Sequence, residues 1–278
     1  MLIGESLELY VADDHLAGFA EFPFAHDGIT HRVFYLGEGP PVLVTHELPG
    51  LTPAALRFGR RLAGEGFRVY LPLLFGEPGQ NNGLDSLRQL CISREFAKLA
   101  AGVSAPIVDW LRGLAIELST RHGHSSVGAI GMCLTGAFVI PLILERCVVA
   151  PVAAQPGAPF SGWFKAIGIG RGPWMSQMNI SDADLHAAAV RASTDGISLL
   201  ALRFQKDRVC PAERLDRLQT VFLSQLVRRE LKGGSFLRPP HSTLTGEYER
   251  APDQPNEETR LLFVEVVEFL SSRLHPKR

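Results

Sequence analysis

The chain has 278 residues, and its 28 basic and 29 acidic side chains give a formal net charge of −1 at pH 7. This balance gives no electrostatic reason to bind nucleic acid or an anionic membrane surface. Hydrophobic residues make up 46% of the chain, which allows a sizeable core and excludes global disorder. No apolar stretch approaches the roughly 18 residues that a bilayer-crossing helix needs, so no membrane contact is expected.

The cysteines and the amino terminus point to a reducing compartment. The four cysteines are widely spaced and form no C-x-x-C pair, which gives no support to a zinc ribbon or a thioredoxin motif. The first six residues lack the basic region of a signal peptide. We therefore expect a cytoplasmic protein in which a free thiol survives, and we predict no metal and no other cofactor.

The first half of the chain alternates between predicted strands and helices. Thr52 is a suitable N-cap for a helix, and Pro53 suits the first helical position. Apolar runs bounded by glycine and proline predict the strands, and apolar residues at helical spacing predict the helices. In chain order we expect a hairpin of 19–24 and 29–35, a strand over 41–45, a helix from 53 to about 64, a strand over 67–74, helices over 84–99 and 107–121, and a strand over 126–132.

The second half continues the alternation. Pro141 falls inside the predicted helix over 134–146 and should bend it. Ser181 and Asn256 are the expected caps of two later helices. The remaining predicted elements are a strand over 148–154, a loop over 157–172, a helix over 182–191, a strand over 197–204, a helix over 211–228, a last strand over 233–237 and a final helix over 257–274.

This order predicts an α/β fold with a mostly parallel central sheet and helices on both of its faces. We expect a single domain over residues 1–278, with an N-terminal extension over about 1–40 and a cap insertion over about 157–192. In such sheets the active site lies beyond the carboxyl ends of the strands. Residues that carry chemistry should therefore meet at that edge.

The stretch Gly131-Met132-Cys133-Leu134-Thr135-Gly136 follows one apolar run and precedes another. A strand, a sharp turn and a helix with a nucleophile at the turn are typical of the α/β-hydrolase fold, usually as G-x-S-x-G. Here Cys133 holds the nucleophile position, and Thr135 stands where the second glycine usually does. Gly131 should let the following helix pass close by.

Two later loops supply an acid and a base in the order that this fold uses, which is nucleophile, acid, histidine. Asp207 follows the predicted strand over 197–204, and His241 precedes the last helix. Asp195 and Asp216 are weaker candidates, because the first precedes that strand and the second lies inside a helix.

These residues predict acyl transfer through a thiol. His241 would take the thiol proton of Cys133, and Asp207 would fix the imidazole tautomer. A helix N-terminus beside Cys133 would stabilise the thiolate. The backbone N–H groups of Leu134 and Leu48 are the expected oxyanion donors.

The motifs resemble those of the dienelactone hydrolase family. The resemblance is carried by the elbow at 131–136, by Glu47-Leu48-Pro49-Gly50 after an early strand, and by Gly66-Phe67-Arg68-Val69-Tyr70-Leu71-Pro72, and it covers roughly residue 41 to the C-terminus. It implies a cysteine hydrolase that acts on a small-molecule ester, lactone or thioester without a metal. It also implies that Glu47 takes part in activating the thiol when substrate binds.

The family's lactone-degrading members hold a substrate carboxylate with arginines, one of them shortly after the histidine. This chain has Ser242-Thr243-Leu244-Thr245 there instead. Arg88 or Arg94 could supply the other arginine, and Trp163 and Trp174 either line a substrate pocket or pack the cap. This departure argues against dienelactone itself as the substrate.

Several residues have an ordinary structural interpretation. Isolated cysteines in apolar sequence are usually small buried hydrophobes, which we expect of Cys91, Cys147 and Cys210. His122 and His124 suit a helix-to-strand turn better than a metal site, since no other ligand set is evident. The alternative functions are an acyltransferase, a carbon–carbon bond hydrolase and a non-catalytic binding module on the same scaffold. Oligomerisation stays open.

Overall fold

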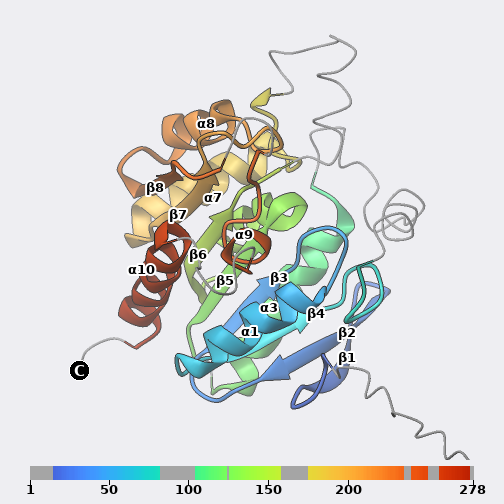
Figure 1. Ribbon diagram of the computed structural model, residues 1–278. Coiled ribbons are helices and arrows are strands. Elements are labelled where there is room, and N and C mark those ends of the chain that lie inside the picture. Colours follow the sequence, from blue (N-terminus) through green and yellow to red (C-terminus); the bar gives the residue numbers. More distant parts are fainter. Residues whose placement is uncertain are drawn as a thin grey trace, which may run out of the picture.

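A computed structural model describes residues 15–81, 104–123, 125–157, 175–234, 239–249 and 257–275. Its centre is an eight-stranded sheet in the order β1-β2-β4-β3-β5-β6-β7-β8 (Figure 1). The strands are β1 (Ala20–His26), β2 (Ile29–Leu36), β3 (Pro41–Thr45), β4 (Arg68–Pro72), β5 (Val127–Met132), β6 (Val148–Ala154), β7 (Leu199–Phe204) and β8 (Leu226–Leu231). β1 and β2 are antiparallel additions at one edge, and the strands from β4 to β8 are parallel.

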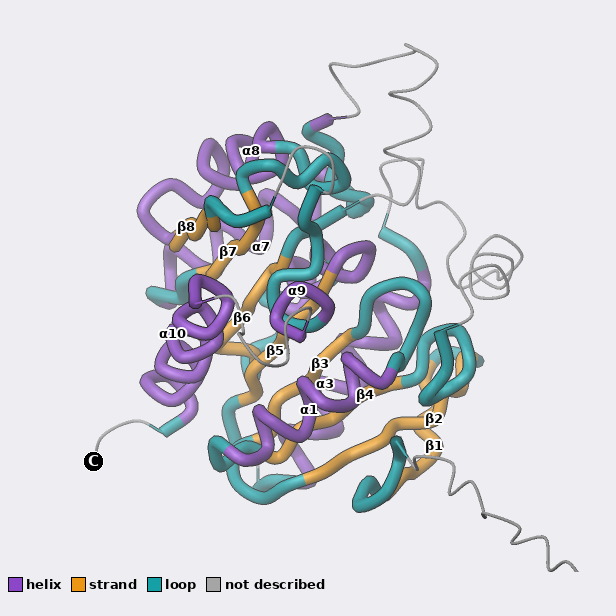
Figure 2. The backbone as a smooth tube through the Cα atoms, in the orientation of Figure 1, coloured by secondary structure: helices purple, strands orange, loops and turns teal. Residues whose placement is uncertain are grey.

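Helices cover both faces of the sheet (Figure 2). α1 (Pro53–Gly64) and α10 (Glu257–Leu274) pack on one face, with the short α9 (Gly246–Glu249) beside α10. On the other face lie α3 (Pro106–Arg121), α4 (Val139–Leu142), α7 (Asp182–Asp195) and α8 (Ala212–Phe222). Every residue of β3, β5 and β7 is buried, which explains why these strands are largely apolar in sequence, and the one charged residue among them, Arg203, pairs with Glu230. The α/β-hydrolase fold predicted from the sequence is confirmed.

Local signals set the helix boundaries. Thr52 accepts a hydrogen bond from the Ala55 amide at 3.2 Å, and Ser181 accepts one from the Asp184 amide at 3.0 Å, so both predicted N-caps are confirmed. α7 ends at Gly196, whose φ of 68° is a left-handed conformation that glycine adopts without strain.

Two predicted elements differ from the structure. The single helix expected over 134–146 is a 3-10 turn, η2 (Cys133–Ala137), followed by the one-turn helix α4, which ends just after Pro141. The helix expected over 211–228 ends at Phe222, and after the short η3 (Leu223–Gln225) the chain forms β8. The last strand therefore comes earlier than 233–237, of which 235–237 lie outside the described residues.

The segments that we expected at the margins of the domain contribute to its body. β2 pairs with β4, so residues 20–36 extend the central sheet. α7 packs against α4 and α8, so the expected cap insertion from residue 182 onward belongs to the helical layer. The helix expected over 84–99, the cap Asn256 and residues 158–174 lie outside the described residues.

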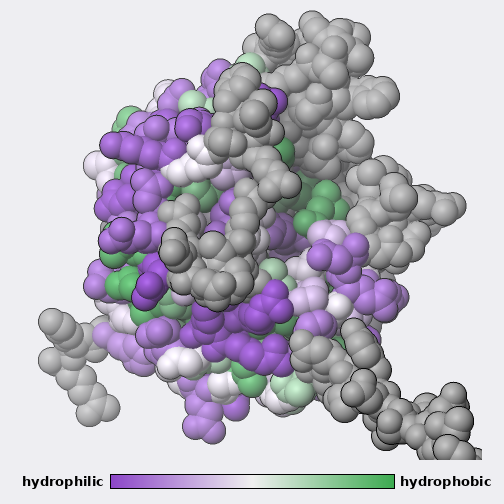
Figure 3. Space-filling model, viewed as in Figure 1, coloured by the Kyte–Doolittle hydropathy of each residue, from purple (hydrophilic) through white to green (hydrophobic). Residues whose placement is uncertain are grey.

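The described surface is mixed in polarity. On the face over α1 hydrophilic residues predominate (Figure 3). Among the described residues, the exposed large hydrophobic ones include Leu261 and Val264, which are neighbours on the outer face of α10. Among the described helices, none has the length and apolar character that crossing a membrane requires.

Candidate active site

Strand β5 ends in a sharp turn at Cys133. Cys133 has φ = 55°, a conformation that a residue with a Cβ rarely adopts, and its side chain is only 7% exposed. A Cβ on Gly131 would lie 2.3 Å from the Thr135 carbonyl oxygen, so only glycine lets the turn fold back this closely. The predicted elbow geometry is therefore present.

Thr135 joins the elbow to the neighbouring strand β3. Its buried hydroxyl accepts from the Met132 amide at 3.2 Å and from the Thr45 hydroxyl at 2.9 Å. It also lies 3.1 Å from the His46 carbonyl and 3.0 Å from the Met132 carbonyl, either of which can accept its single proton. The threonine is accommodated at this position because its hydroxyl is hydrogen-bonded to the elbow and to β3.

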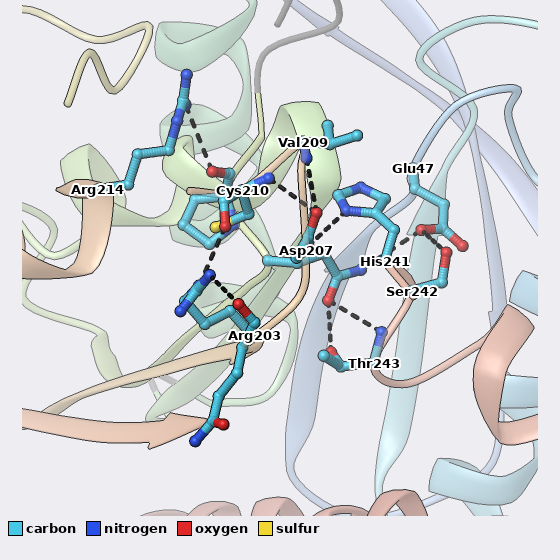
Figure 4. A network of polar contacts seen from close by, with 12 residues as sticks. Glu47, Arg203, Asp207, Val209, Cys210, Arg214, His241, Ser242 and Thr243 are labelled. Atoms are coloured by element: carbon cyan, nitrogen blue, oxygen red, sulfur yellow. Dashed lines mark hydrogen bonds and ion pairs between the residues drawn. The ribbon is translucent and has the colours of Figure 1, made fainter. Parts of the chain in front are cut away.

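Asp207 and His241 meet as the sequence predicts. Asp207 Oδ2 lies 2.7 Å from His241 Nδ1, and Asp207 Oδ1 accepts from the amides of Val209 at 2.7 Å and Cys210 at 2.9 Å (Figure 4). Asp207 is buried directly after β7, so its carboxylate is fixed by the turn that leads into α8. A fixed carboxylate at Nδ1 leaves Nε2 of the ring available for proton transfer.

The other side of the His241 ring faces Cys133. Burial lowers the pKa of His241, but the charge of Cys133, the hydrogen bond to Asp207 and the charge of Asp207 outweigh it, and the pKa is raised well above 6.5. Gly157, whose amide donates to the Cys133 carbonyl at 2.9 Å, also bounds the ring: a Cβ there would lie 3.4 Å from His241 Cε1. The raised pKa therefore favours the protonated ring of His241 beside the elbow.

Glu47 is buried next to these groups but is held by the segment that carries the histidine. Its Oε2 accepts from Ser242 Oγ at 2.8 Å and from Gln155 Nε2 at 3.4 Å, and its Oε1 accepts from Thr245 Oγ1 (Figure 4 shows the Ser242 bond). Gln155 Oε1 in turn accepts from the amide and the hydroxyl of Thr243. Glu47 is thus surrounded by neutral donors.

His46 is a second buried histidine at this edge, with a different environment. Its Nδ1 donates to the Glu47 carbonyl at 3.1 Å, and its Nε2 accepts from the Leu74 amide at 3.0 Å. Burial lowers its pKa to about 4, so the ring is neutral at pH 7. It connects the loop after β3, which contains Leu48, to the chain after β4.

The two predicted oxyanion donors lie on adjacent loops. Leu134 follows Cys133 in the elbow, and Leu48 follows Glu47; Leu48 packs against the core cluster that contains Cys133 and Leu134. Thr135 and His46 connect these loops. Their role as oxyanion donors stays a prediction.

The other described cysteines are less reactive than an exposed thiol. Burial raises the pKa of Cys210, which is fully buried three residues after Asp207, and burial also raises the pKa of Cys147. His122 ends α3 and contacts the Tyr70 hydroxyl at 2.8 Å, consistent with the expected turn. Nowhere in the described ranges do histidine, cysteine and acidic residues form a cluster that could hold a metal.

Some predicted residues cannot be placed, and some participating residues were not predicted. Arg88, Arg94, Trp163 and Trp174, together with Cys91 and His124, lie outside the described residues. Sequence reasoning missed Gln155 as a site residue, and it noted 242–245 only for the absent arginine. A glutamine directly after a strand of a parallel sheet was the available signal, because the carboxyl ends of such strands carry the site.

Solved structures with a similar fold come from several hydrolases. A putative dienelactone hydrolase from Klebsiella pneumoniae superposes with a TM-score of 0.56 at 14% identity, covering 93% of this chain and 98% of the other. An esterase from Pyrococcus furiosus gives 0.58 at 12% identity, covering 92% and 91%. The thioesterase domain from the curacin biosynthetic pathway gives 0.54 at 12% identity, covering 90% and 99%. These likenesses show the fold.

The family is shown by sequence. No curated protein matches the chain. The model of the dienelactone hydrolase family matches residues 34–192, more than half of the chain, and this region contains the elbow and Glu47. With the eight-stranded sheet and the turn at Cys133, this match means that the chain belongs to the dienelactone hydrolase family.

Proposed function

We propose that the protein is a cysteine-dependent hydrolase of a small-molecule carboxylic ester, lactone or thioester, with Cys133 as the nucleophile. One observation carries the proposal: a cysteine with φ = 55° directly after β5 faces His241, whose Nδ1 is bound by buried Asp207 at 2.7 Å. Strained backbone at a nucleophile is retained where the turn displays a reacting group. The family match and the hydrolase neighbours support the same reaction class.

The reaction would proceed in two halves. The Cys133 thiolate attacks the acyl carbonyl, and the tetrahedral oxyanion is stabilised by the amides of Leu134 and Leu48. The carbon–oxygen or carbon–sulfur bond then breaks, and the leaving group takes a proton from the His241 imidazolium. Water next gives a proton to His241 and attacks the acyl-enzyme, which releases the acid and regenerates the thiolate. Asp207 stabilises the imidazolium in both halves.

The residues directly after the histidine supply no arginine for a substrate carboxylate. Thr245, rather than an arginine, donates to Glu47 at this side of the site. A basic side chain from Arg88 or Arg94, and an aromatic wall from Trp163 and Trp174, remain predictions for substrate binding. We therefore place ester, lactone and thioester substrates in one class, defined by the bond that the thiolate attacks.

A panel of p-nitrophenyl esters, aryl lactones and acyl thioesters tests the proposal on wild type and Cys133→Ala. We expect turnover by wild type, loss of turnover in Cys133→Ala, and an acyl adduct on Cys133 in intact-mass and peptide spectra. Cys147→Ala is the matched control, since Cys147 is a half-buried thiol away from the elbow. Equal turnover by wild type and Cys133→Ala would exclude the thiol mechanism.

A further inference from the structure

The side-chain amide of Gln155 joins two loops that carry predicted catalytic groups. One loop follows β3 and carries Glu47. The other is the segment 239–245, which carries His241 and which we call the histidine loop. Gln155 itself follows β6. Gln155 is fully buried, and its backbone has φ = 36°, which is rare for a residue with a side chain. The backbone N–H of Gln155 donates to the Leu202 carbonyl at 2.7 Å, so the Gln155 backbone is fixed to β7.

The hydrogen bonds define the orientation of the Gln155 amide. The Thr243 backbone N–H can only donate, so the atom of Gln155 that it meets at 3.2 Å must be the oxygen. The Gln155 nitrogen then faces the Glu47 carboxylate, which can only accept when ionised. A glutamine satisfies both neighbours at once.

Most donors to Glu47 belong to the histidine loop. Ser242 and Thr245 donate to the carboxylate, and Thr243 donates to Gln155, which donates to the same carboxylate. His241 begins this run of residues, and Asp207 contacts only its Nδ1. The contact to Asp207 fixes one ring nitrogen, whereas the hydrogen bonds of Ser242, Thr243 and Thr245 hold the backbone from which the ring projects.

We propose that Gln155 is a positioning residue that ties the histidine loop to Glu47 and so holds His241 against Cys133. This inference rests on the proposed function, because it assigns Gln155 to the alignment of the proposed base. Gln155 acts through Thr243 and Glu47 and touches neither the thiol nor the substrate. A misplacement of about 1 Å in such a site costs on the order of a hundredfold in rate.

Gln155→Glu is the most informative variant, because it keeps the shape of the side chain and changes one donor. Ionised, it would set two carboxylates against each other, and one of them would therefore keep a proton to an unusually high pH. Protonated, the new acid can still donate to Glu47 and accept from Thr243. The other titratable or charged groups around the junction are His241, Asp207, Cys133, neutral His46 and Arg214, which donates to the Pro156 carbonyl.

The experiment measures the alkylation rate of Cys133 by iodoacetamide from pH 5 to pH 9, followed at the peptide level by mass spectrometry. For Gln155→Glu we expect wild-type rates at low pH and a fall of roughly tenfold or more above one added proton-dissociation step. Gln155→Met lacks the amide donor and acceptor, so it should lower the alkylation rate at every pH. Gln205→Glu is the matched control, since it adds the same charge at an exposed glutamine near this edge.

Hydrolysis provides a second measurement. Gln155→Met should lower kcat roughly tenfold to a hundredfold with KM unchanged, because substrate contacts are untouched. Thermal unfolding accompanies each variant, and the low-pH form of Gln155→Glu serves as the folded reference. Alkylation profiles of Gln155→Glu that match wild type, or that fall uniformly with no added step, overturn the inference. If wild type hydrolyses no ester, the proposed function fails while the alkylation profiles still decide the role of Gln155.

Discussion

Two histidines, His46 fully buried and His241 partly buried, lie at the carboxyl edge of the same sheet, and their environments drive their pKa values in opposite directions. His46 is fully buried, bonds only to backbone groups and has a pKa of about 4. His241 meets the Asp207 carboxylate and Cys133, and its pKa is raised well above 6.5. Burial lowers both pKa values, so the difference comes from the partners.

The comparison separates a histidine used as a rigid connector from one used to hold a proton. Backbone partners satisfy both nitrogens of His46 in the neutral form, and protonation would set an N–H against the Leu74 amide. An acidic partner at Nδ1 and a thiol at the other side stabilise the charged form of His241. Depth in the protein alone therefore does not identify the functional histidine.

The largest expected effect is on activity at His241. His241→Gln should lower kcat by about ten-thousandfold, because the proposed base and the imidazolium are both removed. The variant should remain folded at pH 7. Steady-state kinetics and urea denaturation measure the two quantities. A loss of activity that merely follows a loss of folded protein would contradict the assignment.

The pH dependence of stability should divide between the two histidines. Unfolded His46 takes up a proton near pH 6.5, whereas the folded form resists until about pH 4, so the unfolding free energy falls as the pH drops across this window. The full loss is about 3 kcal/mol. The raised pKa of His241 has the opposite sign, since its contribution is complete below pH 6.5 and is lost as the pH rises through its folded pKa.

Urea denaturation at half-unit steps from pH 4 to pH 9 measures both slopes. His46→Gln should flatten the acid slope, and His241→Gln should flatten the alkaline one. Other carboxylates titrate in the acid range, and the difference between wild type and His46→Gln removes their contribution. An acid slope that persists unchanged in His46→Gln would refute the role given to burial.

His46→Leu should cost about 1–3 kcal/mol at pH 7, because the buried Leu74 amide loses its acceptor. The same change should weaken catalysis in the folded fraction only modestly, since His46 bonds to backbone groups around the site. Denaturation and active-site titration with an acylating inhibitor give the two values. A larger effect on turnover than on stability would place His46 among the reacting groups.

The smallest effect is spectroscopic. Cys133→Ala removes the thiolate that raises the pKa of His241, so the imidazole should titrate at lower pH. His46 should titrate as in wild type. Selective 13C labelling of histidine and NMR from pH 4 to pH 9 follow both rings. An unmoved His241 titration would show that Asp207 alone sets its charge.

Much of the fold follows from the sequence because its strands are buried on both faces. The largely apolar runs at 41–45, 127–132 and 199–204 predict strands, and Arg203 is the one charged residue in them. β8 was missed because its centre is charged: Arg228 pairs with Asp216 on α8, and Arg229 with Glu265 on α10. Consecutive charged residues in an edge strand resemble the exposed surface of a helix until their ion-pair partners are known.

The candidate triad residues could be picked out from the sequence, but the residues around them could not. Cys133, Asp207 and His241 follow a fixed order along the chain, and each comes after a recognisable turn. Gln155 and Thr245 are neutral polar residues in loops, where the same residue types also serve as ordinary turn residues. Only the folded chain brings Thr245 to Glu47, from which it is separated by 198 positions.

The hydroxyl pair at the elbow has a consequence for how related sequences diverge. Thr135 serves the Met132 amide and the Thr45 hydroxyl together, and both lie where no water reaches them. A glycine at 135 would remove an acceptor from each, so a sequence with glycine there gains from an apolar residue at 45. Positions 45 and 135 should therefore vary as a pair among relatives, which makes them a marker of descent for this form of the elbow.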